Sequence, residues 1–200
     1  MESRLTYPPT NRLDSMKWCQ YILENPDKFC LLDTETTGVE ADSEVIELAI
    51  INPLGEVLFE DFFLPSGDIE NSATKLNRVT KDKLRQKGSK PYLASHYRIK
   101  KAVSGKTFIA YNAQFDYRIL KNTAKLYRVE TPFSQNFVCA QKLVQAFYGK
   151  TKPLNGDHTA LGDCRKMLEE IKTIANSEEE DNGHKPINTH EDVKMYHEMW

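Results

Sequence analysis

Apolar and polar positions alternate along the chain in blocks that predict strands first and helices later. Residues 29–35 (FCLLDTE) form a nearly continuous apolar run, which is typical of a strand buried on both faces. Two further strand-like runs follow at 44–52 and 56–64, separated by a Pro-Leu-Gly turn. Because tight turns favour antiparallel neighbours, the sequence predicts an antiparallel meander in this part of the chain.

The rest of the chain alternates between short strand-like runs and segments with helical periodicity. The predicted strands are 107–112 and 136–140, and the predicted helices are 13–24, 114–127, 140–148 and 159–175, with one or two more helices in the polar, basic segment 66–106. Strands followed by alternating strands and helices indicate an α/β fold, in which helices flank a mixed sheet.

Changes in composition divide the chain into three predicted parts. Residues 1–28 form an N-terminal lead-in and a short helix, residues 29–175 form the main folded domain, and residues 176–200 form an acidic, flexible tail. The last stretch, 190–200, is also compatible with a short terminal helix.

Composition narrows the class of protein. Of the 200 residues, 40% are hydrophobic and 28% are charged, as expected of a soluble globular protein. No apolar run approaches the ~20 residues that span a bilayer, so no membrane partner is predicted. The four cysteines are scattered without a CxxC pair, which argues against a zinc knuckle or a disulfide framework. Their use favours a reducing, cytoplasmic location.

The formal net charge of −2 is the sum of unequal parts. Residues 1–70 carry a net charge of −11, residues 71–150 carry +14, and residues 151–200 carry −5. Seven basic side chains fall between Lys75 and Lys90. This basic stretch is either a solvated face or a surface that binds a polyanion, and charge alone does not decide between the two.

An acidic pair lies at the carboxyl end of the first predicted strand, in the segment DTETTG. Side chains alternate across a strand, so Asp33 and Glu35 point to the same face. Two carboxylates on one face repel each other, and burial makes their ionisation unfavourable, which a divalent cation between them would offset. Mg²⁺ suits a site of carboxylate oxygens, and Gly38 lets the backbone approach a ligand closely. The alternative is an exposed acidic turn.

Two more acids and a histidine lie near the ends of predicted elements. Asp116 comes early in the helix that follows strand 107–112, where an acid also stabilises a helix N-terminus. Asp163 falls at the edge of the apolar stripe of helix 159–175, and His158 precedes that helix. Each of these residues, taken alone, is compatible with an ordinary structural or surface role.

Taken together, the segments DTETTG, YNAQFD and HTALGD resemble, in this order, the three signatures of the DEDDh 3′–5′ exonucleases. The H-x4-D spacing from His158 to Asp163 is that of the histidine subclass. The resemblance covers residues 29–175 and implies a ribonuclease H-like fold for this exonuclease domain. The family includes polymerase proofreading exonucleases, ribonuclease T-like enzymes and oligoribonucleases.

The resemblance also implies catalytic roles for individual residues. Two Mg²⁺ or Mn²⁺ ions would be held by four acidic residues, Asp33, Glu35, Asp116 and Asp163. His158 would accept the proton of the attacking water, a role suited to an imidazole near neutral pH. The two metal ions would offset the four negative charges, which explains how so many carboxylates could converge.

Four further residues are implied to bind substrate: Thr36, Thr37, Gly38 and Asn112. The first three would bind the 3′ end of the terminal nucleotide, partly through backbone N–H groups, and Asn112 would lie beside Asp116. Three positions depart from the family pattern, with Tyr111 and Asn77 where histidine is frequent and Cys139 where aspartate is frequent. None of the three is a metal ligand in the family, so they bear on substrate contacts rather than on the reaction.

The resemblance therefore implies a metal-dependent 3′–5′ exonuclease that removes 5′-mononucleotides from the 3′ end of DNA or RNA. The expected substrate is a nucleic acid with a free 3′ end, single-stranded by preference, and a polymerase or another replication or repair protein is a further candidate partner. The alternative is a catalytically silent nucleic-acid-binding or polymerase-associated subunit on the same fold. Such a subunit would be expected to lack at least one of the five catalytic residues, and all five are present.

Overall fold

A mixed five-stranded sheet with the strand order β3-β2-β1-β4-β5 forms the centre of the protein. The computed structural model describes residues 7–178. The strands are β1 (Phe29–Thr36), β2 (Val45–Ile51), β3 (Val57–Phe62), β4 (Thr107–Ala110) and β5 (Val138–Cys139). The first three strands pair antiparallel, as the meander predicts, and β4 pairs parallel with both β1 and β5. The predicted mixed sheet is confirmed.

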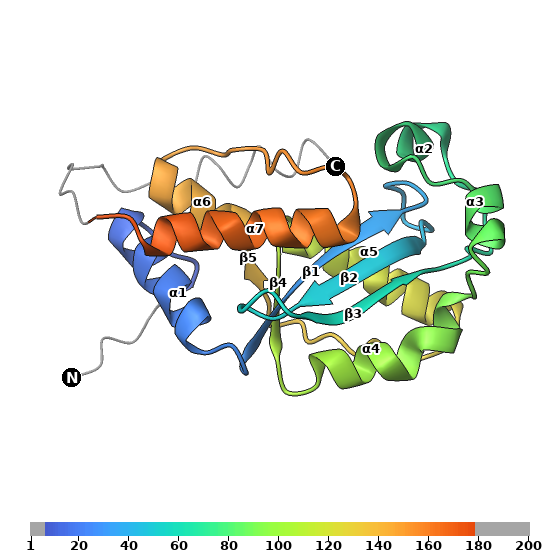
Figure 1. Cartoon of the computed structure of the whole chain (residues 1–200), viewed down its shortest axis with the longest axis horizontal. Helices are drawn as coiled ribbons and strands as arrows, with labels where there is room; N and C mark the ends of the chain where they lie inside the picture. Colours follow the sequence, from blue (N-terminus) through green and yellow to red (C-terminus); the bar gives the residue numbers. More distant parts are fainter. Residues whose placement is uncertain (1–6, 179–200) are drawn as a thin grey trace.

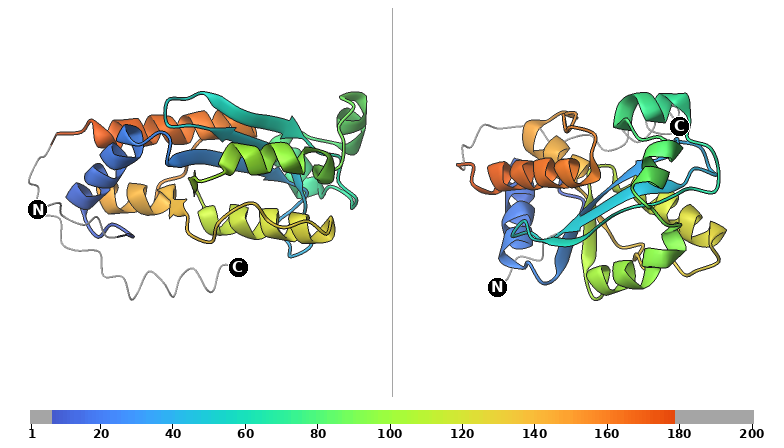
Figure 2. Two further views of the ribbon diagram at one scale, coloured as in Figure 1. Left: turned by 90° about the horizontal axis from the view of Figure 1, so that it is seen from below. Right: turned by 45° about the vertical axis from the view of Figure 1, so that its right-hand side comes forward.

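Helices cover both faces of this sheet (Figures 1 and 2). The helical elements are α1 (Arg12–Glu24), α2 (Asn71–Asn77), α3 (Lys81–Gln86), the 3₁₀ turn η1 (Tyr92–Ser95), α4 (His96–Val103), α5 (Ala113–Leu126), α6 (Ala140–Tyr148) and α7 (Ala160–Ala175). Helices α1, α6 and α7 pack on one face, and α4 and α5 pack on the other. The sheet is therefore buried on both sides.

The segment 66–106 is more broken than its polar pattern predicts. In place of one or two helices it contains α2, α3, η1 and α4. Arg78 and Gly88 adopt left-handed backbone conformations shortly after α2 and α3, with φ angles of 59° and 70°. A left-handed residue ends a helix because the following N–H groups turn back to the last helical carbonyls. At Arg78 the helix ends at a residue type that does not by itself predict a left-handed conformation.

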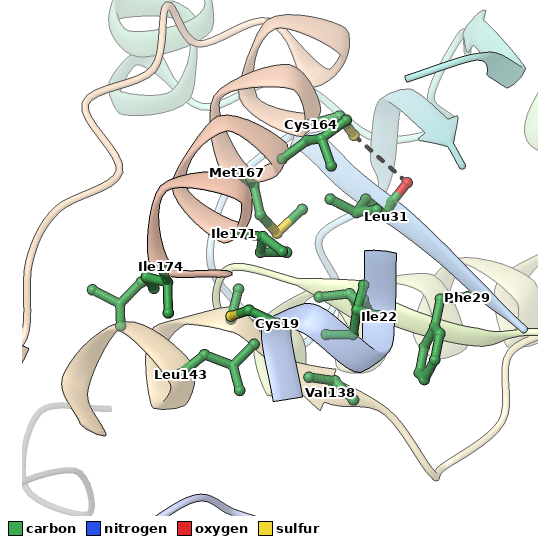
Figure 3. Packing of buried hydrophobic residues seen from close by; sticks show 14 of the residues in the cluster. Cys19, Ile22, Phe29, Leu31, Val138, Leu143, Cys164, Met167, Ile171 and Ile174 are labelled. Carbon is green, nitrogen blue, oxygen red and sulfur yellow. Dashed lines mark hydrogen bonds between the residues drawn. The ribbon is translucent and has the colours of Figure 1, made fainter. Parts of the chain in front are cut away.

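Alternate residues of β1 belong to two separate apolar layers. Leu31 lies in the layer that α1, α6 and α7 cover, and Leu32 lies in the layer that α4 and α5 cover. Figure 3 shows the first layer, where Cys164 of α7 lies 3.8 Å through Sγ from the carbonyl oxygen of Leu31. The same sulfur lies 3.5 Å from the carbonyl oxygen of Ala49 in β2. The apolar face of α7 packs on this side of the sheet, and the neighbouring Asp163 comes to the end of the sheet.

Three further predictions concern the domain boundaries, the C-terminal tail and the absence of a membrane-spanning segment. Helix α1 packs against α6 and α7, and the boundaries predicted between residues 28 and 29 and between 175 and 176 stay predictions. The helix considered for 190–200 lies outside the described residues, as does the tail beyond residue 178. Between residues 7 and 178, no helix combines the length and the apolar character that crossing a membrane requires.

Candidate active site

The carboxyl end of β1 is the place where acidic side chains gather. The pairing of β1 with β4 runs only from Phe29 to Leu31, whereas its pairing with β2 continues to Thr36. Helix α5 follows directly after β4, and α7 begins beside the end of β1 (Figure 1). In open α/β sheets, ligands bind at the carboxyl ends of the strands, where the strand order reverses.

Four acidic side chains converge at this end of β1, and we refer to Asp33, Glu35, Asp116 and Asp163 as the acidic centre. Asp33 and Glu35 alternate with Thr34 along β1, so they share the face that α7 covers. The hydroxyl of Thr34, on the opposite face, donates a hydrogen bond of 2.8 Å to Oδ1 of Asp116 in α5. One strand therefore presents two acids directly and holds a third through the residue between them.

The electrostatics of the acidic centre favour a bound cation. Burial, followed by the negative charges of the neighbouring carboxylates, raises the pKa of Asp33 well above its ordinary value. Burial and then the charge of Glu47 raise the pKa of Glu35 to about 8, and burial raises the pKa of Asp116 to about 7. Burial also raises the pKa of Asp163. The charges of the other acids thus oppose the ionisation of Asp33 and Glu35, and a divalent cation among them would remove that opposition.

His158 and Asp163 are brought together by the turn that enters α7. The hydroxyl of Thr159 caps the helix and accepts a hydrogen bond of 3.1 Å from the N–H of Gly162. Asp163 lies in the first turn, where its carboxylate accepts hydrogen bonds from the backbone N–H groups of His158 and Asp157. The φ angle of His158 is 60°, which is uncommon for a residue with a side chain. Such a conformation persists only where surrounding contacts hold it, so the fold imposes the position of His158.

The residues of the acidic centre fit a divalent metal ion. Ligand atoms of Glu35, His158 and Asp163 lie within 4.8 Å of one another. Oδ1 of Asp163 is buried and has no hydrogen-bond partner in the described part of the chain, which is unfavourable unless a cation satisfies it. Gly156 leaves room for this carboxylate, since a Cβ at that position would overlap it. Mg²⁺ prefers oxygen-rich surroundings of this kind.

Three of the residues predicted to bind substrate follow Glu35 directly, and their polar groups are engaged within the protein. The hydroxyl of Thr36 donates a hydrogen bond of 2.7 Å to the carbonyl oxygen of Gly38. The hydroxyl of Thr37 accepts one of 2.9 Å from the N–H of Glu44. Gly38 packs against the carboxylate of Glu70, which a Cβ at position 38 would overlap. Contacts within the protein therefore constrain the conformation of this segment. Its role in substrate binding stays a prediction.

Asn112, the fourth of these residues, lies beside Asp116 as the sequence predicts. It precedes the first turn of α5, and its carbonyl oxygen accepts a hydrogen bond of 3.4 Å from the N–H of Asp116. Its side chain is exposed and makes no capping hydrogen bond to the helix. Asn112 thus fixes the start of the helix through its backbone and leaves its amide open toward solvent. Its contact with substrate stays a prediction.

Asn77, which the sequence marks only as a departure from the family pattern, supports the acidic centre. Its side-chain amide donates hydrogen bonds to the Glu35 carboxylate and, at 3.3 Å, to the carbonyl oxygen of Thr36. Its Oδ1 accepts a hydrogen bond of 3.0 Å from the N–H of Val79. One buried amide therefore connects the end of α2 to a predicted metal ligand. A polar residue at the end of a short helix carries no sequence signal for this role.

Glu47 is the acidic residue that the sequence reasoning missed. It lies opposite Glu35 in the pairing of β1 with β2 and is 3% exposed. Burial raises its pKa to about 7, and its carboxylate accepts a hydrogen bond from the N–H of Ala160, which lowers that pKa. Ala160 is the first residue of α7, so Glu47 connects the sheet to the helix that carries Asp163. The available signal was a glutamate inside the apolar run EVIELAIIN, since a charge in a buried strand needs a partner.

Known proteins resemble this chain in both sequence and fold. A family model described as Exonuclease (RNase_T) matches residues 30–171. An uncharacterized exonuclease, CP81, of Escherichia phage 186 is 25% identical over 174 residues, which cover 74% of this chain and 89% of the relative. The DNA polymerase III subunit epsilon of Treponema pallidum is 25% identical over 175 residues, which cover 78% of this chain and 80% of the relative.

Solved structures share the fold. The structure of exonuclease I superposes with a TM-score of 0.62 at 17% identity over 72% of this chain, and the chain spans 40% of exonuclease I. The nuclease domain of 3′hExo, described as a DEDDh family member bound to rAMP, gives a TM-score of 0.58 at 14% identity. That match covers 74% of this chain and 92% of the domain. The expected ribonuclease H-like fold is confirmed.

Proposed function

The chain belongs to the RNase_T exonuclease family and is therefore a nuclease, and from this premise we propose that it removes 5′-mononucleotides from the 3′ end of DNA or RNA by metal-dependent hydrolysis. The observation that carries the proposal is the convergence of four carboxylates at the end of β1, with His158 beside two of them. The order of the three sequence motifs supports the same reaction.

The acidic centre would hold two Mg²⁺ or Mn²⁺ ions. When bound, such ions supply positive charge that stabilises the negative charge developing on the phosphodiester. The protein holds its carboxylates in advance: a strand backbone carries Asp33 and Glu35, the hydroxyl of Thr34 holds Asp116, and loop N–H groups hold Asp163. Little reorganisation is then needed during the reaction.

His158 would accept the proton of the attacking water. A ring nitrogen of His158 lies within 4.8 Å of carboxylate oxygens of Glu35 and Asp163. The proton must go to a ring nitrogen that still has its lone pair, because a protonated imidazole is a donor only. The side chain is exposed, so it can pass the proton on to solvent before the next cycle.

The proposed substrate is a nucleic acid with a free 3′ end, and we expect a single strand to bind best. Exonuclease I of E. coli, which has a similar fold, was solved in complex with a dT13 oligonucleotide. The relative from T. pallidum is a polymerase subunit. We therefore include a polymerase as a candidate protein partner in the same reaction. We place the activity in the cytoplasm, where the four free cysteines would stay reduced.

Digestion of a 5′-labelled single strand tests the proposal. With Mg²⁺ or Mn²⁺ we expect a ladder of stepwise shorter products, and with EDTA or in Asp33→Ala we expect none or very little. An inverted 3′-terminal nucleotide should block digestion, whereas a blocked 5′ end should not. A wild-type protein that binds the strand but shortens it with neither metal would overturn the proposal and favour a silent binding subunit.

A further inference from the structure

We propose that a pocket at the β3 edge of the sheet binds a phosphodiester group of the strand being degraded, on the 5′ side of the scissile bond. The pocket has a volume of about 480 Å³ and lies between β3, the residues that follow α3, and the start of α4. The proposal rests on the proposed exonuclease function, because it names a second contact of the same strand. The contact is chemically a phosphodiester anion held by cations.

The charge of the pocket is positive. Three cations line it, Lys87, Lys90 and Arg98, together with one carboxylate, Asp61. Nη1 of Arg98 lies 3.0 Å from Oδ2 of Asp61, so these two charges compensate each other. Between residues 7 and 178, Lys87 and Lys90 form no salt bridge. We refer to Lys87 and Lys90 as the pocket lysines, and their charges make the pocket a site for an anion.

Contacts within the protein also hold the charged side chains of the pocket in place. Nζ of Lys87 lies 3.6 Å from the centroid of the Phe62 ring, a cation–π contact that holds the side chain against β3. On the other rim, the hydroxyl of Ser95 donates a hydrogen bond of 2.7 Å to Asp61, which also binds Arg98. The carboxylate is thus occupied by two donors of the protein and competes little for the pocket lysines.

Strand pairing places one rim of the pocket, at Phe62, close to the acidic centre, whereas the rim at Asp61 and Arg98 lies toward α4. Glu35 of β1 lies opposite Glu47 of β2, and Glu47 lies opposite Phe62 of β3. Cross-strand neighbours share a face of the sheet, and adjacent strands are about 4.8 Å apart, so Phe62 lies roughly 10 Å from Glu35. A stacked strand rises about 3.4 Å per nucleotide, so it would reach Lys87 about three nucleotides from its end. Figure 1 shows α3, which precedes Lys87, beside the end of β3.

Three neighbouring cations of the basic stretch are less suited to this contact. Nζ of Lys81 lies 3.2 Å from Asp68, and Nη1 of Arg85 lies 3.0 Å from Asp82. Nζ of Lys83 donates a hydrogen bond of 2.9 Å to a backbone carbonyl oxygen. Local partners therefore occupy these side chains, whereas the pocket lysines line a cavity. Among the five cations from Lys81 to Lys90, the pocket lysines are therefore the two best suited to bind a strand.

Binding of oligonucleotides of two lengths tests the proposal. Fluorescence anisotropy with 5′-fluorescein-labelled oligo(dT) of 3 and 12 nucleotides would be measured on the full chain with Ca²⁺ at several salt concentrations. The variant Lys87→Gln/Lys90→Gln should bind the 12-mer about tenfold more weakly and the 3-mer less than twofold more weakly. The slope of log affinity against log salt should become shallower by about 0.7, the value for one lost phosphate contact on a single strand.

The matched control is Lys100→Gln/Lys101→Gln, which removes the same charge from exposed positions of α4 outside the pocket. It should change the affinity for either length by less than twofold. Equal losses in the two double variants, equal losses for the two lengths, or an unchanged affinity of the pocket variant for the 12-mer would each overturn the proposal.

Hydrolysis separates this proposal from the exonuclease function. If the wild type degrades both oligonucleotides and the pocket variant keeps the wild-type ratio of kcat/KM between the 12-mer and the 3-mer, the pocket proposal fails and the exonuclease function stands. If the wild type degrades neither, the exonuclease function fails, and the binding measurements still decide whether the pocket holds a strand.

Discussion

Folding brings the residues of the acidic centre together, whereas it separates those of the basic stretch between Lys75 and Lys90. The acids are far apart in the sequence, from Asp33 to Asp163, and they converge at one end of β1. The basic residues are close in the sequence, yet they spread over α2, α3 and the turn that follows, and two of them pair with nearby acids. Proximity in the fold, rather than in the sequence, decides whether like charges build a site.

The two regions also differ in how strongly each charge acts. The acids are buried or half-buried, and their charges raise the pKa of Asp33 and Glu35, so a change at one acid affects its neighbours. The basic side chains are mostly exposed, and exposed ion pairs contribute only about 0 to 1 kcal/mol each. A substitution in the acidic centre is therefore expected to change function far more than one in the basic stretch.

The substitution Asp33→Asn should have the largest effect. It removes one charge from the acidic centre without a change of shape, and we expect nucleotide release with Mg²⁺ to fall by at least about 10³-fold. Single-turnover digestion of a labelled strand measures the loss. The exposed acid Asp68 provides the control, because Asp68→Asn should keep the wild-type rate. A rate for Asp33→Asn above a tenth of wild type would contradict the role of this carboxylate.

The stability of the metal-free protein should fall as pH rises. The pKa values of Glu35, at about 8, and of Glu47 and Asp116, at about 7, are above the ordinary carboxyl value. The neutral forms thus stabilise the folded state, fully so below about pH 4, and this contribution is lost as pH rises through about 7 to 8. In EDTA we expect Tm to drop by about 5 °C or more between pH 5 and 8.5.

Thermal unfolding with EDTA and with Mg²⁺ checks this dependence. Mg²⁺ should reduce the drop, because it stabilises the ionised carboxylates, and Glu35→Gln should raise Tm at pH 8.5 in EDTA by several degrees. A Tm that rises with pH in EDTA would mean that the carboxylates do not oppose one another's ionisation.

The substitution Asn77→Ala should have a smaller effect than Asp33→Asn, because it changes a residue that supports the acidic centre. It removes the amide that donates to Glu35 but leaves the carboxylates in place. We expect the Mg²⁺ concentration for half-maximal activity to rise about tenfold, as for other residues that orient metal ligands. A titration of the rate with Mg²⁺ measures this. The control is Asn122→Ala, which removes an amide that donates a hydrogen bond to the carbonyl oxygen of Ala41. Equal Mg²⁺ requirements in the two variants would make Asn77 a purely structural residue.

Charge reversal in the basic stretch should have the smallest effect. Binding of a single strand should weaken steeply with salt, and Lys81→Glu/Lys83→Glu/Arg85→Glu should weaken it further by about threefold. The effect is limited because two of these side chains already pair with Asp68 and Asp82. Anisotropy at two salt concentrations measures it. An unchanged affinity would leave these three positions as a solvated face.

Local patterns were sufficient to predict much of this protein. Apolar runs and helical periodicity are properties of neighbouring residues, and they located the strands of the meander and α5, α6 and α7 within a few positions. The gathering of the four acids was implied by the resemblance that the three motifs carry, since each acid taken alone was compatible with an ordinary structural role. The breaks in 66–106 were missed, since Arg78 takes a left-handed conformation that its residue type does not signal.

Only the tertiary structure decided which residues support the acidic centre and which cations can act. Glu47 reaches Ala160, and Asn77 reaches Glu35, through strand pairing and helix placement that no local pattern encodes. The same holds for the basic stretch, where the fold gives Lys81 an acidic partner and leaves the pocket lysines at a cavity. Periodicity depends on a residue's neighbours along the chain, whereas burial, hydrogen bonding and charge compensation depend on its neighbours in space.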